Sequence, residues 1–227
     1  MKSIIDPADV CVRPCVKEDM KDVHELDRQY MTTKASLEWL SQRREKNPDL
    51  FYVAHDSRGG AKPIGYISGD VFIHPHDGKE KGYISRLVVL PDYRKIGVGT
   101  MLINALEFAF VRYRNFDTIF VGVRKTNPGA QEFYSKLGYI RVPEFDNPTG
   151  YSEYHVTPEE RYMMVYSKPL YTTLDYPFNA CVFVPSDLFK IVPENKPKPT
   201  ARLKREVKGD IGGKEKKKKV QRHGTHK

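Results

Sequence analysis

A glycine-rich turn between an apolar strand and an amphipathic helix is the feature that most limits how this chain of 227 residues can fold. Residues 83–90 end in Leu-Val-Val-Leu, a run that predicts a strand buried on both faces. Residues 94–99 read Arg-Lys-Ile-Gly-Val-Gly, and residues 100–115 form a predicted amphipathic helix. One face of it carries Leu102, Ile103, Leu106, Phe110 and Tyr113. Backbone N–H groups and the dipole at the start of a helix attract anions. The sequence therefore predicts an α/β chain whose loop 94–99 holds a phosphate or pyrophosphate group.

The spacing of these glycines does not fit two common nucleotide-binding motifs. The loop does not complete Gly-x-Gly-x-x-Gly, and no Gly-Lys-Ser/Thr follows it. A plain strand-to-helix turn without a ligand is the alternative. Alternating and helical apolar patterns predict further elements around this unit. They are strands at residues 10–16, 50–55, 64–73 and 118–124, and helices at residues 18–30, from Thr32 or Thr33 to before Pro48, and from Asn127 onward.

Two segments together resemble the GNAT superfamily of N-acetyltransferases. The pattern Arg94-x-x-Gly97-x-Gly99 resembles the acetyl-CoA loop of that superfamily. Residues 127–139 resemble its Asn-x-x-Ala-x-x-x-Tyr-x-x-x-Gly-Phe/Tyr segment, with the tyrosine at Tyr134. Asn127 can cap the predicted helix, and Gly138 fits its C-terminal stop. The opening strand and helix are also similar, and residues 161–168 look like the closing strand. The resemblance thus covers residues 10 to about 170, with the motifs in the right order.

The resemblance implies the fold and the co-substrate. The fold class is α/β (α+β): a central mixed, mostly antiparallel twisted sheet of about seven strands, flanked by about four helices and splayed between the fourth and fifth strands. Acetyl-CoA is the implied co-substrate, bound partly by the free edge of the fourth strand, as a further strand would be. The implied cofactor-binding residues are Leu87, Val88, Val89, Arg94, Lys95, Ile96, Gly97, Val98, Gly99, Thr100, Asn127 and Tyr134.

The implied catalytic residues are Tyr134, Tyr83 and Ser85. Tyr134 matches the tyrosine that donates a proton or a hydrogen bond to the departing CoA sulfur; the alternative is that it only packs under the pantetheine. Many members carry a carboxylate in the strand before the loop, but this chain has Ser85 and Arg86 there. Two-residue periodicity predicts that Tyr83, Ser85 and Leu87 share one face of the strand.

The resemblance assigns the general base to no single residue. Tyr83 aligns with a tyrosine of some protein N-terminal acetyltransferases, which pair it with a histidine on the next strand. This chain offers Phe120, Val121 and Gly122 there. The base is then a water held by Tyr83 and Ser85, or a side chain of another loop. Histidine is a common general base near neutral pH, but we expect His74 and His76 to be solvated loop residues.

A further group of expectations concerns the pocket for the acceptor amine and the C-terminal segments. Tyr151, Tyr154 and His155 lie where the family often forms its amine pocket, and aromatic faces suit a cationic amine. We expect residues 1–170 to form the acetyltransferase domain and the apolar residues 171–193 to pack on it. Residues 194–227 hold thirteen Lys and Arg and four acids, which accounts for the whole net charge of +9. This Lys-rich tail is predicted to be disordered and to offer a possible contact with a polyanion.

Three functions from different classes agree with these observations. The first is acetyl-CoA-dependent transfer of an acetyl group to a primary amine in a ternary complex. Its acceptor is a small amine or a protein amino group, including an N-terminus or a histone lysine reached through the tail. The second is a nucleic-acid-associated protein, and the third is a non-catalytic acyl-CoA-binding module.

The remaining features of the sequence concern cysteines, metals and location. Cys11 and Cys15 are four residues apart in an extended segment, too far for a disulfide, and no matching Cys/His pair suggests a metal site. No run of about 18 apolar residues suggests a membrane span. The N-terminus lacks an apolar stretch of signal-peptide length, so we expect a cytoplasmic or nuclear location, or both.

Overall fold

A seven-stranded mixed sheet organises the part of the chain that the structure describes. The computed structural model describes residues 6–60, 62–74, 76–146 and 163–170. The strand order is β1-β2-β3-β4-β5-β7-β6, and every neighbouring pair is antiparallel except β4 and β5. The strands are β1 Val10–Pro14, β2 Phe51–Asp56, β3 Pro63–Ile73, β4 Glu80–Val89, β5 Thr118–Arg124, β6 Ile140–Arg141 and β7 Met163–Pro169. The sheet confirms the predicted fold class.

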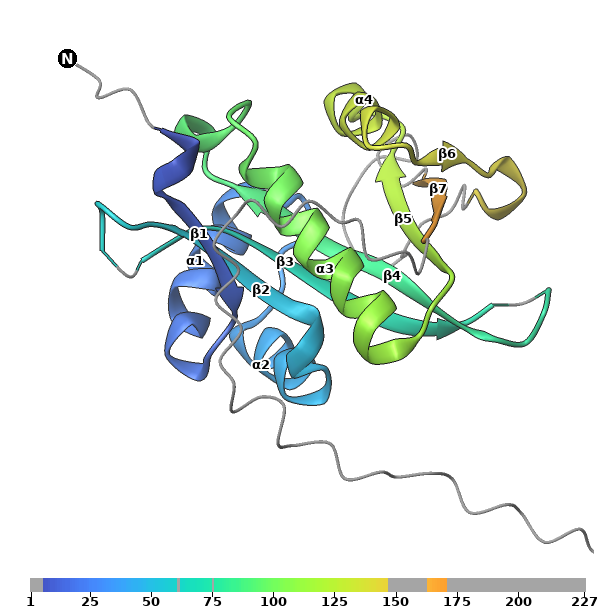
Figure 1. Ribbon diagram of the computed structural model, residues 1–227, viewed down its shortest axis with the longest axis horizontal. Helices are drawn as coiled ribbons and strands as arrows, with labels where there is room; N and C mark the ends of the chain where they lie inside the picture. Colours follow the sequence, from blue (N-terminus) through green and yellow to red (C-terminus); the bar gives the residue numbers. More distant parts are fainter. Residues whose placement is uncertain (1–5, 61, 75, 147–162, 171–227) are drawn as a thin grey trace, which may run out of the picture. The chain divides into compact units, whose positions relative to one another are not determined.

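Helices cover both faces of the sheet (Figure 1). They are α1 Met20–Tyr30, α2 Leu37–Lys46, α3 Val98–Arg114 and α4 Pro128–Lys136. Helix α3 packs on one face, where its buried Leu102, Leu106 and Phe110 meet inward side chains of β1 to β5. Helices α1 and α2 pack on the other face, around Leu40 and Phe51. Each face therefore has its own apolar core.

No helix among these described segments is long and apolar enough to cross a membrane.

Two sequence predictions about the helices need correction. Tyr113, expected on the apolar face of α3, is 38% exposed. Helix α2 begins at Leu37, and its cap is Ser36, whose hydroxyl accepts a hydrogen bond from the Trp39 N–H; neither Thr32 nor Thr33 caps it. The residues before Ser36 are held outside the helix because their backbone is bonded to a buried ion pair.

This ion pair joins Asp27 of α1 to Arg86 of β4. Asp27 is 0% exposed, and its carboxylate accepts hydrogen bonds from Tyr66 Oη, Arg86 Nη1 and the Ala35 N–H at 2.5, 2.5 and 2.7 Å. Arg86 Nη1 also donates to the Thr33 carbonyl at 2.9 Å. Buried charges are tolerated when they are paired and hydrogen-bonded in this way. The network ties the α1–α2 connection to the central strand.

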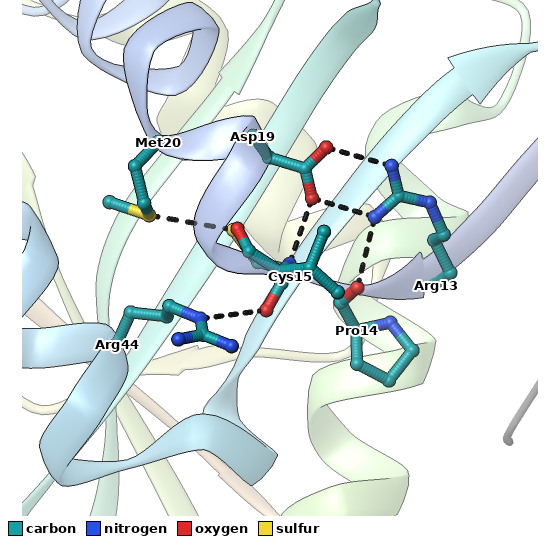
Figure 2. Close-up of polar contacts among 7 residues, drawn as sticks. Arg13, Pro14, Cys15, Asp19, Met20 and Arg44 are labelled. Carbon is teal, nitrogen blue, oxygen red and sulfur yellow. Dashed lines mark hydrogen bonds and ion pairs between the residues drawn. The ribbon is translucent and has the colours of Figure 1, made fainter. Parts of the chain in front are cut away.

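A second polar cluster fixes the junction between β1 and α1 (Figure 2). Arg13 donates two hydrogen bonds to the Asp19 carboxylate, at 2.6 and 2.7 Å. Arg44 of α2 donates to the Cys15 carbonyl at 2.9 Å. The Cys15 thiol lies 3.6 Å from the Met20 sulfur, and burial raises the pKa of the thiol to about 12. The cluster holds the chain where it turns from β1 into α1.

Candidate active site

The central opening of the sheet arises where β4 and β5 separate. They pair only from Gly82 to Ile84 on β4, opposite residues 119–121 of β5. Beyond this point β4 continues along β3, whereas β5 continues along β7. A β-bulge lies at the same place, because Ile84 and Arg86 face adjacent residues of β3 and leave Ser85 between them. The structure thus shows the predicted splay between the fourth and fifth strands.

The edge of β4 beyond the splay presents backbone groups to the opening. The Leu90 N–H donates to Ile64 O of β3 at 2.9 Å, and hydrogen-bonding direction alternates along an antiparallel strand. Leu87 and Val89 therefore direct their N–H and C=O groups away from β3, whereas the backbone of Val88 faces β3. The Val89 carbonyl accepts a hydrogen bond from Arg94 Nε at 2.8 Å. Of the three predicted strand contacts, the structure brings Leu87 and Val89 to the open edge.

The predicted anion-binding loop leads into α3 with left-handed backbone at two positions. Lys95 has φ 64° and Gly97 has φ 97°; the first is unusual for a residue with a side chain. The first helical bond runs from the Met101 N–H to Gly97 O, and no described side chain caps the helix. The N–H groups of Val98, Gly99 and Thr100 precede that bond and suit a pyrophosphate. Ile96 packs against the core beneath α3.

Gly97 and Gly99 of this loop are glycines for different structural reasons. A Cβ added at Gly97 would meet nothing within 4 Å, so this position needs glycine for its backbone angle and leaves room for a ligand. A Cβ added at Gly99 would lie 3.1 Å from the Phe133 ring of α4. Close packing of α3 against α4 therefore explains Gly99. Arg94 and Lys95 are exposed beside the loop.

Helix α4 brings Tyr134 to the same opening. Asn127 caps α4 by accepting a hydrogen bond from the Ala130 N–H at 3.1 Å, and Gly138 ends it with φ 84°, both as predicted. Tyr134 is 6% exposed, and its hydroxyl has no hydrogen-bond partner among the described residues. Burial, with a smaller contribution from the Tyr83 hydroxyl, raises the pKa of Tyr134 above its ordinary value. The phenol therefore stays protonated at neutral pH and is available as a donor.

A buried carboxylate holds the surroundings of Tyr134. The rings of Tyr134 and Tyr139 meet edge to face, with centroids 5.3 Å apart. The Tyr139 hydroxyl donates to Glu107 Oε1 at 2.8 Å, and Lys168 Nζ pairs with both Glu107 oxygens at 3.0 and 2.9 Å. Glu107 thereby joins α3, β7 and the end of α4 around the tyrosine.

The other catalytic candidates lie on the opposite face of the sheet. Tyr83 is the register partner of Asp70 on β3 and of Phe120 on β5, so the three side chains share a face. A Cβ added at Gly122 would lie 2.7 Å from the Tyr83 hydroxyl, so the absence of a side chain there makes room for the phenol. Leu87 packs on the α3 side, because the bulge reverses the alternation after Ser85. The prediction that Tyr83, Ser85 and Leu87 share one face was therefore wrong.

A carboxylate that the sequence argument missed stands beside Ser85. Ser85 Oγ donates to Asp70 Oδ2, and the same oxygen pairs with Arg43 of α2. The Arg43 guanidinium also lies over the Trp39 ring, 4.3 Å from its centroid. Asp70 is the only charged residue of β3, a signal that marks a paired or functional carboxylate.

His74 does not behave as a solvated loop residue. Its ring lies 5.5 Å from that of Phe120 and 5.1 Å from that of Phe145, and Nδ1 is 3.0 Å from Asp77 Oδ1. His76 is exposed and packs its ring against Phe145. These rings extend the aromatic surface around Phe120 on the face that carries Tyr83. The predicted amine-pocket residues Tyr151, Tyr154 and His155 lie outside the described residues.

Comparisons with known proteins agree with this geometry. The model of the acetyltransferase (GNAT) family matches residues 18–139. An uncharacterised N-acetyltransferase of Methanocaldococcus jannaschii is 34% identical over 142 residues, which are 56% of this chain and 59% of that protein. An N-terminal acetyltransferase complex ARD1 subunit homolog of Dictyostelium discoideum is 26% identical over 161 residues, covering 70% of this chain and 74% of the relative.

Solved structures with the same fold include an enzyme bound to a bisubstrate analogue. The crystal structure of Chaetomium thermophilum Naa20 in that complex has a TM-score of 0.58 and 26% identity. The similarity covers 71% of this chain and 87% of the Naa20 chain. The described sheet and its flanking helices thus have a counterpart among acetyltransferases.

Proposed function

Because the chain belongs to the GNAT family of acetyltransferases, we propose that it transfers an acetyl group from acetyl-CoA directly to a primary amine in a ternary complex. One observation carries the proposal. The open edge of β4, the start of α3 and the hydroxyl of Tyr134 converge on the splay between β4 and β5, and no described side chain caps that helix start or bonds to that hydroxyl. They supply, in order, a backbone edge for pantetheine, N–H groups for pyrophosphate and a donor for the leaving sulfur.

The proposed chemistry follows from what these groups can donate. The amine nitrogen attacks the thioester carbon, and a backbone N–H of the β4 edge, at Leu87 or Val89, stabilises the oxyanion that forms. The C–S bond then breaks, and Tyr134 donates a proton or hydrogen bond to the thiolate. No covalent enzyme intermediate is required, because the binding of both substrates supplies proximity. Arg94 and Lys95 add positive charge beside the pyrophosphate.

We propose a protein α-amino group as the first acceptor to test. Several similar proteins carry N-terminal acetyltransferase names, including the Dictyostelium discoideum relative above and a second one named N-alpha-acetyltransferase 20, which is 31% identical. Small amines and lysine side chains are the alternatives. The matched segment spans 59% of the Methanocaldococcus jannaschii protein, so its activity carries over only as part of this proposal.

The proposal is tested by CoA release from acetyl-CoA with separate panels of N-terminal peptides, lysine peptides, polyamines and arylalkylamines. We expect turnover on at least one peptide that has a free α-amine and none on the same peptide blocked at its N-terminus. Acetyl-CoA binding without turnover on any acceptor would contradict the enzyme and favour a binding module.

The roles of the C-terminal segments stay predictions. We propose that residues 171–193 pack on the domain formed by residues 1–170, and that the basic residues 194–227 contact a polyanion. Binding to RNA or DNA that weakens steeply with salt, and that is lost on deleting residues 194–227, tests the contact. We also propose a cytoplasmic or nuclear location, which fluorescence of the tagged full chain tests.

A further inference from the structure

We propose that Asp70 and Ser85 form a relay that takes the proton from the acceptor amine. The proposal rests on the acetyltransferase function above and adds a carboxylate, supplied by the neighbouring strand β3, to a central strand that has none at this position. Both residues lie at the β-bulge where β4 leaves β5, the place where the two substrates must meet.

The face of the sheet on which the pair lies is the first argument. Helices α3 and α4 and Tyr134 lie on one side of the splay. Tyr83, Ser85 and Asp70 lie on the other side, where the register pairs Asp70 with Tyr83. The Asp70 side chain is 16% exposed, and Ser85 is half-buried. An amine that approaches the splay from this face therefore meets the Asp70–Ser85 pair before it reaches the β4 edge.

The direction of the Ser85 hydrogen bond is the second argument. A hydroxyl has one proton to donate and two lone pairs that accept. Ser85 donates its proton to Asp70 Oδ2, so only its lone pairs remain for a ligand. An ammonium group has only donors, so it complements a hydroxyl oriented in this way.

The charges around Asp70 are the third argument. Arg43 of α2 pairs with Asp70, and a neighbouring guanidinium keeps a carboxylate ionised, so Asp70 Oδ2 is unprotonated when the acceptor arrives and releases a transferred proton readily to solvent. Arg86, the next residue on β4, directs its guanidinium to Asp27 instead. Tyr83 faces the pair from the adjacent position on β4. The bulge thus directs Arg86 to Asp27 of α1. Asp70 and Ser85 face the side from which we propose that the acceptor approaches.

The proton balance of the step is complete. The acceptor arrives as R–NH3+, and one N–H proton passes to Ser85 Oγ while the Ser85 proton passes to the Asp70 carboxylate. The neutral amine attacks the thioester carbon, and the C–S bond breaks. The attacking nitrogen still carries two protons: one remains in the amide, and the other is lost as the amide forms. CoA leaves as the thiol, with a proton from Tyr134. Asp70 returns its proton to solvent, and the nitrogen proton restores Tyr134 through solvent.

The test measures kcat/KM for the peptide acceptor in Ser85→Ala and Asp70→Asn between pH 6.5 and 9.5. A terminal α-amine has a pKa near 8, so it enters as the ammonium at the lower pH and as the neutral amine at the higher. We expect both variants to lose about 100-fold at pH 6.5 and less than about tenfold at pH 9.5, because a neutral amine needs no relay. Ser85→Thr retains the hydroxyl and should keep most of the activity.

Asp49→Asn is the matched control. Asp49 pairs with Arg114 at 2.7 Å, with side chains 25% and 32% exposed, close to the 16% and 34% of Asp70 and Arg43. This pair lies at the C-terminal end of α3, away from the splay, so its loss should leave kcat/KM unchanged at every pH. Acetyl-CoA affinity and thermal unfolding are measured for each variant.

The possible outcomes separate the two proposals. Full activity of Ser85→Ala or Asp70→Asn at pH 6.5, or a loss that is the same at both pH values, contradicts the relay while the acetyltransferase function stands. A wild-type protein that acetylates none of the amines contradicts both.

Discussion

Exchanging two neighbouring tyrosines for phenylalanine should separate chemistry from stability. The Tyr134 hydroxyl has no partner among the described residues, whereas the Tyr139 hydroxyl donates to buried Glu107 at 2.8 Å. The two rings are in contact and both side chains are buried, so Tyr134→Phe and Tyr139→Phe each remove one hydroxyl oxygen from a buried phenol, and the two oxygens differ in their hydrogen bonding. Each variant is therefore the control for the other.

The expected magnitudes follow from these contacts. Tyr134→Phe removes the proposed donor to the leaving thiolate, and general acid catalysis contributes about 100-fold or more, or about 3 kcal/mol of barrier. Its unfolding free energy should change by less than about 0.5 kcal/mol, because no described hydrogen bond is lost. Tyr139→Phe should lower the unfolding free energy by about 1.5 kcal/mol, because it removes a hydrogen bond to a charged group. Lys168 still pairs with Glu107 in that variant, which limits the loss.

The assay combines CoA release at saturating acetyl-CoA, acetyl-CoA affinity by calorimetry, and urea unfolding. Tyr134→Phe should lower kcat with little change in affinity or stability, and Tyr139→Phe should do the reverse. Because burial raises the pKa of Tyr134, wild-type kcat should not fall through loss of this proton as the pH rises to about 10. Undiminished turnover in Tyr134→Phe, or equal losses of turnover and stability in both variants, would refute the assignment of Tyr134 as the donor.

Three further predictions test the structure around the site. Asp27→Ala should lower the unfolding free energy by about 3 to 5 kcal/mol in urea, because it leaves a buried guanidinium unpaired; a loss below 1 kcal/mol would speak against the network. Gly97→Ala should lower the unfolding free energy by about 1 to 2 kcal/mol, because the backbone at this position is left-handed. Gly99→Ala should instead displace α4 and lower kcat. Equal effects of the two substitutions on kcat would contradict these separate roles. Iodoacetamide should modify Cys11 before Cys15 in the native protein, since the Cys15 thiol, with its pKa near 12, stays protonated at neutral pH and gains reactivity only as the pH rises toward that value; the opposite order by mass spectrometry would contradict the buried setting.

The parts of the site that the sequence predicts are those encoded locally. The loop 94–99, the cap at Asn127 and the helix stop at Gly138 depend on residues close in the chain, and the structure has each of them where it was expected. A glycine with positive φ or an Asx cap acts within a few residues, so its pattern is readable without the fold.

The parts that the sequence does not predict depend on strand register. The partnership of Asp70 with Ser85 needs both the β3–β4 register and a bulge that shifts the alternation by one residue. The cap of α2 moves from Thr33 to Ser36 because the Thr33 carbonyl is bonded to Arg86, which is 53 residues away in sequence. Periodicity assumes an unbroken strand and a free helix terminus, and neither assumption holds at these two places.

Amide hydrogen exchange, measured with and without acetyl-CoA, locates the binding site of the co-substrate directly. We expect slower exchange at Leu87 and Val89 on the β4 edge and at residues 97–100 at the start of α3. Exchange at Val88 should change little, because its N–H already faces β3. Unchanged exchange at both segments when acetyl-CoA is bound, or protection confined to another part of the chain, would contradict the proposed site of the co-substrate.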